Sequence, residues 1–248
     1  MLKMQKRITS KHVAILFCLV ICFVSCAHKS GHRRDRERPG TTMADCSNGK
    51  SSRSTARKSK IVNKRSSNKL EGSQIFDRYG SAVFMVFTTD GSNTYQGSGF
   101  FIDNGGLAVS NYHVFKGTGM GLEQIKLVGS DVAYKVTEII TRSEDEDFIL
   151  FRVDCENNNY IPIATEKPKI GEKVYAIGSP RGLENTFSSG EVSQWRADNL
   201  MQISALIDHG SSGGALINEY GEVVGITSGS FADGSQANLN YAWSIDIV

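Results

Sequence analysis

Short runs of β-branched and aromatic residues, separated by Gly, Asn and Asp, fill the chain from about residue 74 to its end. Runs of this kind are typical of strands joined by turns. The runs that predict strands are 82–87, 99–102, 125–128, 132–140, 148–151, 174–177, 191–193, 200–205, 214–217, 223–227 and 240–245. Many short strands at close spacing predict a β-barrel or a β-sandwich. We find no helical period of useful length and no internal repeat.

The stretch 27–73 is rich in Ser, Lys, Arg, Asn and Gly and almost lacks aromatic residues, which predicts a basic, disordered linker. Residues 27–71 carry thirteen Lys/Arg against four Asp/Glu, whereas residues 72–248 carry eleven against twenty-two. The net charge of +2 therefore hides a basic tail on an acidic body. The Arg-rich piece 32–38 could contact nucleic acid or an anionic membrane surface, but a solvated linker is the simplest interpretation, and we expect no nucleic-acid partner.

The first 26 residues have the pattern of an export signal, in which basic residues precede the apolar run 13–24. That run is too short to cross a bilayer comfortably. The tetrapeptide 23–26, Phe-Val-Ser-Cys, is similar to a bacterial lipobox and makes Cys26 a candidate for lipidation. Ordinary signal cleavage and an uncleaved membrane anchor remain open. All three predict a body outside the cytoplasm, in the cell envelope, as a periplasmic protein or a membrane-anchored lipoprotein.

The five cysteines predict neither a disulfide scaffold nor a metal site. Cys18 and Cys22 lie in the apolar run and Cys26 in the lipobox-like segment, so only Cys46 and Cys155 remain. One of these is in the basic tail and the other in the body, so we expect no disulfide between them. No dinucleotide-binding glycine pattern is present, and we expect no cofactor.

The loop 210–214, Gly-Ser-Ser-Gly-Gly, is the first candidate for chemistry. A serine hydroxyl is a poor nucleophile, so it needs a base within hydrogen-bond reach, a third group that fixes the tautomer of that base, and donors for the oxyanion. Glycines allow a tight turn whose N–H groups face one point. We therefore expect Ser212 as nucleophile in an oxyanion hole formed by Gly210, Ser211 and Ser212, with Gly210 and Ser212 as donors. Alone, the loop is more typical of a plain turn.

Flanking segments change this interpretation. Residues 97–102 (GSGFFI), 107–114 (LAVSNYHV) and 210–215 (GSSGGA) resemble the motifs G-S-G-x-x-I, L-T-N-x-H-V and G-N-S-G-G-P of the HtrA/DegP branch of the chymotrypsin-like serine proteases. Residues 170–180, 188–193 and 221–226 are similar to further strands of that family, so the resemblance spans about residues 80–247. Ser211 replaces the family's Asn and Ala215 its Pro.

The resemblance implies the remaining catalytic residues. His113 takes the position of the base, a role that suits an imidazole because its unperturbed pKa is about 6.5. Asp147 lies directly before the apolar run 148–151, as the family's acid does, whereas the acids at 144–146 would lie in a solvated loop. A histidine that merely packs at a strand end, and an acidic run that is only a solvated turn, are the simpler alternatives. The order His113, Asp147, Ser212 is that of the chymotrypsin type.

The implied fold is all-β, with two antiparallel six-stranded β-barrels and the active site in the cleft between them. The predicted organisation is an export signal at 1–26, a linker at 27–73 and a protease domain at 74–248, with barrel one at about 74–157 and barrel two at about 158–248. Family members often continue into PDZ domains. The sequence stops at Val248, so we expect a member without a PDZ domain or a chain that continues. A homotrimer is a further expectation of the family.

The expected activity is endoproteolysis of unfolded or envelope proteins, an HtrA-like role in quality control. A substrate peptide is expected to add as a strand against the segment 227–230. The residues that we expect to bind it are Thr227, Ser228, Gly229, Tyr241 and Trp243. Trp243 replaces a small aliphatic residue of the family, which leaves the preference of the pocket open. We see no charged residue at the base of the pocket, which argues against strict cleavage after Lys or Arg.

Ser211 stands where digestive enzymes of the trypsin type carry an Asp that pairs with a newly cut N-terminus. We therefore expect activity without N-terminal processing. Two other functions remain open. One is a catalytically silent protein that holds peptides in the same groove, and the other is an envelope-attached interaction protein that works through its basic tail.

Overall fold

The computed structural model describes residues 68–118, 121–155, 158–179, 185–230 and 239–248. The predicted export signal, Cys26 and the linker up to residue 67 lie outside the described residues. No helix in the described ranges is long and apolar enough to cross a membrane.

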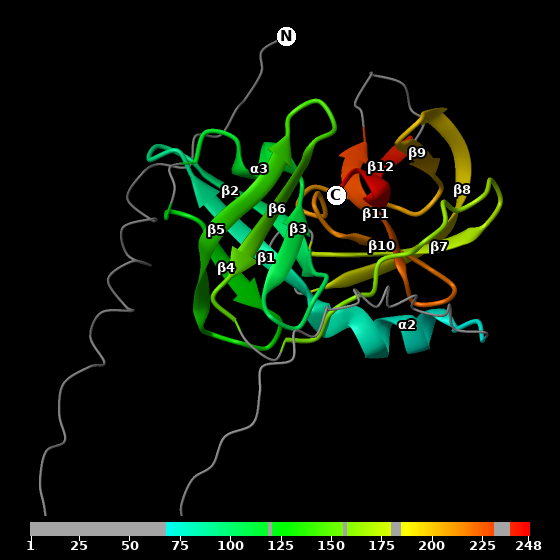
Figure 1. Cartoon of the computed structure of the whole chain (residues 1–248), viewed down its shortest axis with the longest axis horizontal. Coiled ribbons are helices and arrows are strands. Elements are labelled where there is room, and N and C mark those ends of the chain that lie inside the picture. The colour runs from blue at the N-terminus through cyan, green and yellow to red at the C-terminus, as the bar shows by residue number, and fades with distance from the viewer. Residues whose placement is uncertain (1–67, 119–120, 156–157, 180–184, 231–238) are drawn as a thin grey trace, which may run out of the picture. The chain divides into compact units, whose positions relative to one another are not determined.

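Twelve strands form two closed antiparallel barrels of six strands each, which confirms the predicted fold class (Figure 1). The first barrel closes in the order β1-β2-β3-β6-β5-β4. Its strands are β1 (Val83–Thr89), β2 (Thr94–Phe101), β3 (Leu107–Ser110), β4 (Gln124–Leu127), β5 (Ala133–Ser143) and β6 (Phe148–Val153).

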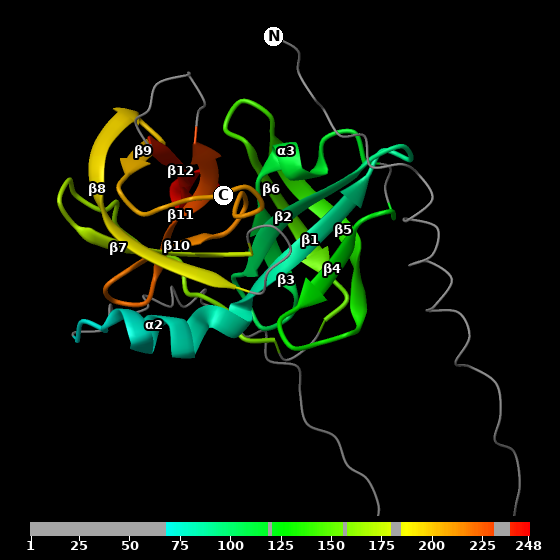
Figure 2. The same cartoon turned by 180° about the vertical axis from the view of Figure 1, so that it is seen from behind.

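The second barrel closes in the order β10-β11-β12-β9-β8-β7. Its strands are β7 (Lys173–Gly178), β8 (Thr186–Ala197), β9 (Leu200–Ile203), β10 (Ala215–Asn218), β11 (Val223–Ser230) and β12 (Asn240–Ser244). The two barrels lie side by side in both views (Figures 1 and 2). Every predicted strand overlaps an observed one, and β3 is the strand that the run lengths missed.

The alternation of side chains along β2 explains how the barrels join. Phe101 points into the first barrel, where its ring lies 4.6 Å from that of Phe84. Phe100 points the other way, into a shared core that also contains Tyr175 of β7 and Ile217 of β10. Burying one such side chain stabilises the fold by about 1.5–3 kcal/mol. The shared core therefore fixes one barrel against the other.

A helix that the hydrophobic pattern did not predict precedes the first barrel. Helix α2 (Gly72–Tyr79) begins with a capping box between Glu71 and Gln74, and it buries Ile75 and Tyr79, four residues apart on one face. Before it, the Leu70 N–H donates to the Glu219 carbonyl at 2.7 Å. Residues 68–73, which composition assigns to the linker, are thus attached to the second barrel. The pattern missed this helix because it is only two turns long.

The other helical segments are single turns. They are η1 (Gly80–Ala82), α3 (Tyr112–Phe115) and η3 (Ile245–Ile247). Helix α3 matters most for the site, because it carries His113 directly after β3 and buries Val114 and Phe115 beneath it.

Candidate active site

The loop that carries Ser212 is shaped by two glycines. Asp208 O accepts the Ser211 N–H at 3.0 Å across a turn in which Gly210 has a φ of +94°. This is the geometry of a type II turn, which requires glycine at its third position. Gly213 has a φ of +86°, and a Cβ there would lie 2.2 Å from Ser98 O. The loop therefore folds only with glycine at these positions, and it presses against β2 of the first barrel.

His113 and Asp147 are joined by two hydrogen bonds. Asp147 Oδ2 lies 2.8 Å from His113 Nδ1, and Asp147 Oδ1 accepts the backbone N–H of His113 at 2.9 Å. The side chain of His113 is 46% exposed and that of Asp147 is 17% exposed. A carboxylate at Nδ1 favours the tautomer with the proton on that nitrogen. The other ring nitrogen, Nε2, is thereby able to accept a proton.

Asp147 adopts an unusual backbone conformation, with a φ of +48°. Asp and Asn tolerate this left-handed region better than most residues. The conformation is held by Asn111, which is fully buried and whose Nδ2 donates to Asp147 O at 2.8 Å. Strained residues of this kind are often found at functional sites. Asn111 therefore links the end of β3 to the backbone of Asp147, whose carboxylate faces His113.

A bulge in β11 brings a third group to Asp147. Thr227 pairs with Ala242 and Gly229 with Tyr241, so the register shifts at Ser228. Bulges re-aim side chains. Here the Ser228 hydroxyl donates to Asp147 Oδ2 at 2.9 Å. The second barrel thus contributes directly to the orientation of a carboxylate from the first.

Ser212 lies against both barrels. Its carbonyl accepts the Ser98 N–H of β2 at 2.8 Å, and a Cβ on Gly229 would lie 3.4 Å from its hydroxyl oxygen. Ser228 lines both the hollow beside Ser212 and the hollow beside His113. Among the described residues, no direct hydrogen bond joins Ser212 Oγ to the ring of His113. In free enzymes such contacts are often long and shorten when substrate binds.

The N–H groups of the loop divide into two sets. Those of Ser211, Gly213 and Gly214 donate to backbone carbonyls. Those of Gly210 and Ser212 have no protein acceptor among the described residues. Of the three predicted oxyanion-hole residues, Gly210 and Ser212 therefore have N–H groups available to a ligand, and Ser211 uses its N–H within the turn. Two such donors beside one hydroxyl are able to stabilise an oxyanion that forms there.

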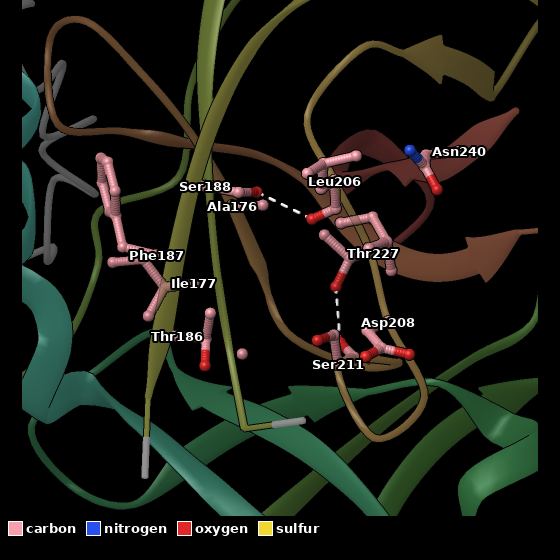
Figure 3. Close-up of a pocket in the computed structure, with 12 residues that line it drawn as sticks. Ala176, Ile177, Thr186, Phe187, Ser188, Leu206, Asp208, Ser211, Thr227 and Asn240 are labelled. Atoms are coloured by element: carbon pink, nitrogen blue, oxygen red, sulfur yellow. Dashed lines mark hydrogen bonds between the residues drawn. The ribbon is translucent and has the colours of Figure 1, made fainter. Parts of the chain in front are cut away.

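Two cavities flank the loop. A hollow of about 210 Å³ lies at Ser212 and is lined by Ile207, Asp208, His209, Ser212, Ser228 and Gly229. A larger cavity of about 440 Å³ lies between strands β7 and β8 on one side and the segment 206–208 on the other (Figure 3). Ile207 and Asp208 line both. Ile207 and Asp208 therefore separate the hollow at Ser212 from the larger cavity.

The predicted substrate-binding residues are dispersed. Ser228 and Gly229 line the hollow at Ser212, whereas Thr227 lines the larger cavity with a side chain that is only 1% exposed. Trp243 lines a different hollow, of about 370 Å³, beside His113 and Asp147. Tyr241 lines none of these three hollows and pairs with Gly229 across the strands.

The sequence did not predict that Ser98 and Asn111 hold the site. It predicted Ser228 as a substrate-binding residue but not its contact with Asp147. Ser98 and Asn111 lie inside the segments 97–102 and 107–114, so their positions were marked by the motifs although their contacts were not. The contact of Ser228 with Asp147 joins residues 81 positions apart and depends on the bulge in β11.

Two six-stranded barrels that carry a histidine, an aspartate and a serine in the chain order His113, Asp147, Ser212 define the class of two-barrel serine peptidases. A model of the trypsin-like peptidase domain matches residues 97–226, the stretch that contains all three. The chain belongs to the trypsin-like peptidase domain family.

Relatives and solved structures agree with this assignment. The chain is 28% identical over 180 residues to Protease Do-like 1, chloroplastic, from Arabidopsis thaliana, a match that covers 66% of this chain and 40% of that protein. It is 34% identical over 162 residues to a probable periplasmic serine endoprotease DegP-like from Pseudomonas putida, covering 61% and 33%. This chain thus matches about half or less of the length of these relatives.

Two crystal structures share the architecture. A serine endoprotease from Yersinia pestis superposes with a TM-score of 0.64 at 27% identity, over 71% of this chain and 63% of that chain. A protease from M. tuberculosis in its active form superposes with a TM-score of 0.60 at 19% identity, over 69% and 79%. At that lower identity the second match supports the fold alone.

Proposed function

We propose that this chain is a serine endopeptidase in which Ser212 is the nucleophile, His113 the general base and Asp147 the group that orients it. The observation that carries the proposal is the pair of hydrogen bonds between Asp147 and His113, next to a serine loop with two available N–H groups. A catalytically silent binder needs no such carboxylate. The similarity to DegP-like endoproteases supports the same conclusion.

In the proposed reaction, Ser212 Oγ attacks the carbonyl carbon of a peptide bond while His113 Nε2 takes the hydroxyl proton. The N–H groups of Gly210 and Ser212 stabilise the negative charge that forms on the carbonyl oxygen. When the C–N bond breaks, His113 returns the proton to the leaving amine, and an acyl-enzyme remains on Ser212. A water molecule, deprotonated by His113, then releases the acid and restores the hydroxyl.

The substrate is proposed to be an extended segment of an unfolded protein. Strand β10 pairs with β11 only from Val223 to Ile226, so the edge of β11 beyond Thr227 is left without β10 as a partner. An extended peptide is able to add to such an edge through backbone hydrogen bonds, which depend little on its side chains. Its carbonyl at the cleaved bond would then lie at Ser212, next to Gly229.

Localisation is a separate proposal. The basic and apolar pattern of residues 1–26 and the periplasmic relatives support export to the cell envelope, with attachment through Cys26 as the finer hypothesis. Mass analysis of the mature N-terminus distinguishes a lipidated Cys26 from a free amine or from an intact Met1. Trimer formation is tested by light scattering of the same material.

Casein digestion by the wild-type chain and by Ser212→Ala tests the activity. We expect hydrolysis by the wild type and a loss of several orders of magnitude in the variant, because the nucleophile is removed while the fold is kept. Gln194→Ala, on β8, is the matched control and should retain activity. Equal and negligible turnover in wild type and Ser212→Ala would overturn the proposal and favour a silent peptide binder.

A further inference from the structure

The hydroxyl of Thr227 holds the peptide unit that presents the Ser212 N–H. Thr227 Oγ1 donates to Ser211 O at 2.7 Å, as Figure 3 shows. In a planar trans peptide the C=O and N–H bonds point in opposite directions. Because the Ser211 carbonyl points toward Thr227, the N–H of Ser212 on the same peptide unit points away from it. The hydroxyl thus sets the direction of one oxyanion donor.

The hydroxyl of Ser98 holds the peptide unit between Gly210 and Ser211, which lies between the peptide that carries the Gly210 N–H and the peptide that carries the Ser212 N–H. Ser98 Oγ donates to Gly210 O at 2.7 Å, while the N–H at the other end of that peptide, on Ser211, donates to Asp208 O at 3.0 Å. Ser98 Oγ also accepts the Ser179 N–H at 2.8 Å. The hydroxyl is therefore an acceptor toward Ser179 and a donor toward Gly210.

Both hydroxyls are shielded from water. Ser98 is 0% exposed and Thr227 is 1% exposed. They come from different barrels, since Ser98 belongs to β2 and Thr227 to β11. The loop between them contains glycine at 210, 213 and 214, and glycine restrains the backbone less than any other residue. A loop of this composition needs restraint from outside if two of its N–H groups are to stay aligned.

A purely structural role explains the Thr227 hydroxyl less well. Ser211 O already accepts the Gly214 N–H at 2.9 Å, so this buried carbonyl would keep a partner without Thr227. The Thr227 hydroxyl adds a second, directional contact to a group that is already satisfied. Its distinct effect is to fix the orientation of the peptide between Ser211 and Ser212.

We propose that Thr227 and Ser98 are positioning residues, whose buried hydroxyls hold the peptides of the nucleophile loop so that the N–H groups of Gly210 and Ser212 face the same oxyanion. This inference rests on the proposed peptidase function. It assigns Thr227 to the support of the loop, in addition to its place on the strand where substrate is expected to add. Neither hydroxyl touches the reacting atoms.

Thr227→Val and Thr227→Ser form the matched pair that tests the proposal. Valine has nearly the same shape and lacks the hydroxyl, whereas serine keeps the hydroxyl and lacks the methyl group. With labelled casein we expect Thr227→Val to lower kcat by about 10- to 100-fold with KM within about twofold, because only the transition state uses the oxyanion donors. Thr227→Ser should restore most of kcat.

A second variant, Ser98→Ala, tests the proposal even if Thr227→Val does not fold. Ser98→Ala removes the contact to Gly210 from the other barrel and should also lower kcat more than it raises KM. Thermal unfolding of each variant shows whether the fold is kept. Wild-type kcat in a folded Thr227→Val and a folded Ser98→Ala would overturn the proposal, as would a loss in Thr227→Ser equal to that in Thr227→Val.

Amide hydrogen exchange separates this inference from the proposed activity. The N–H groups of Ser211 and Gly214 are hydrogen-bonded within the loop and report its rigidity. We expect both to exchange faster in Thr227→Val than in Thr227→Ser. If the wild type does not hydrolyse casein, the proposed peptidase activity fails, and amide exchange alone tests the positioning role of Thr227. Exchange in Thr227→Val at the wild-type rate then overturns the inference, and exchange faster than in the wild type supports the positioning role of Thr227.

Discussion

Replacing Asp147 by asparagine tests the proposed chemistry most directly, because the geometry dictates what the amide does. Asp147 Oδ1 accepts the fixed backbone N–H of His113, so the single amide oxygen of Asn takes that position. The NH₂ group then lies where Oδ2 lay, 2.8 Å from His113 Nδ1. An NH₂ group donates, so Nδ1 must accept and the proton moves to Nε2. The ring then cannot take a proton from Ser212.

We expect Asp147→Asn to lower kcat by about 10⁴-fold, the effect known for a Ser-His-Asp site with the wrong imidazole tautomer. This corresponds to about 5 kcal/mol of lost transition-state stabilisation. The fold should be kept, because Asn tolerates the left-handed conformation at this position as well as Asp does. Steady-state hydrolysis of casein, with thermal unfolding of the same samples, measures both effects.

Glu146→Gln is the matched control for that experiment. Glu146 directly precedes Asp147, but its Oε1 accepts a hydrogen bond from Asn199 at 2.9 Å and does not contact His113. A glutamine oxygen is able to accept the same bond, so activity should stay within about twofold of wild type. A folded Asp147→Asn with near wild-type kcat, or a loss in Glu146→Gln as large as that in Asp147→Asn, would refute the assignment of the acid.

Three further outcomes are expected. Ser228→Ala should lower kcat by about tenfold, because one hydrogen bond that holds the Asp147 carboxylate is lost, and a wild-type value would show that the bond has no effect on turnover. Cys155 should resist iodoacetamide at neutral pH in the folded chain and react after unfolding, since burial raises the pKa of its thiol, and peptide mass analysis detects the difference. Hydrogen bonds from the Asn93 and Ser92 backbone and from Tyr95 lower the pKa of Asp90 in the folded chain. The unfolded chain therefore binds the proton first, and the free energy of unfolding falls as the pH drops below about 4. In urea unfolding, Asp90→Asn should lose less stability than the wild type between about pH 5 and pH 3.

The strands were the most predictable part of the molecule. A run such as 148–151 is apolar and rich in aromatic and branched residues, as strands are, and it became part of β6. Helix α2 was not predictable in this way, because its two buried residues, Ile75 and Tyr79, are covered only when the shared core between the barrels forms. The contact between Leu70 and Glu219 could not be predicted for the same reason, since the two residues lie far apart in the sequence.

The sequence by itself determined eleven of the twelve strands and the glycines without which the loop at Ser212 could not turn, because these follow from local pattern. Its resemblance to the HtrA/DegP proteases pointed to His113, Asp147 and Ser212. Only the tertiary structure decided which groups hold them. Three features depend on residues that lie far apart in the chain: the bulge that turns Ser228 toward Asp147, the position of Trp243 beside His113, and the hydrogen bond from Ser98 to Gly210. Such contacts depend on how the two barrels close and pack, and no short stretch of sequence contains that information.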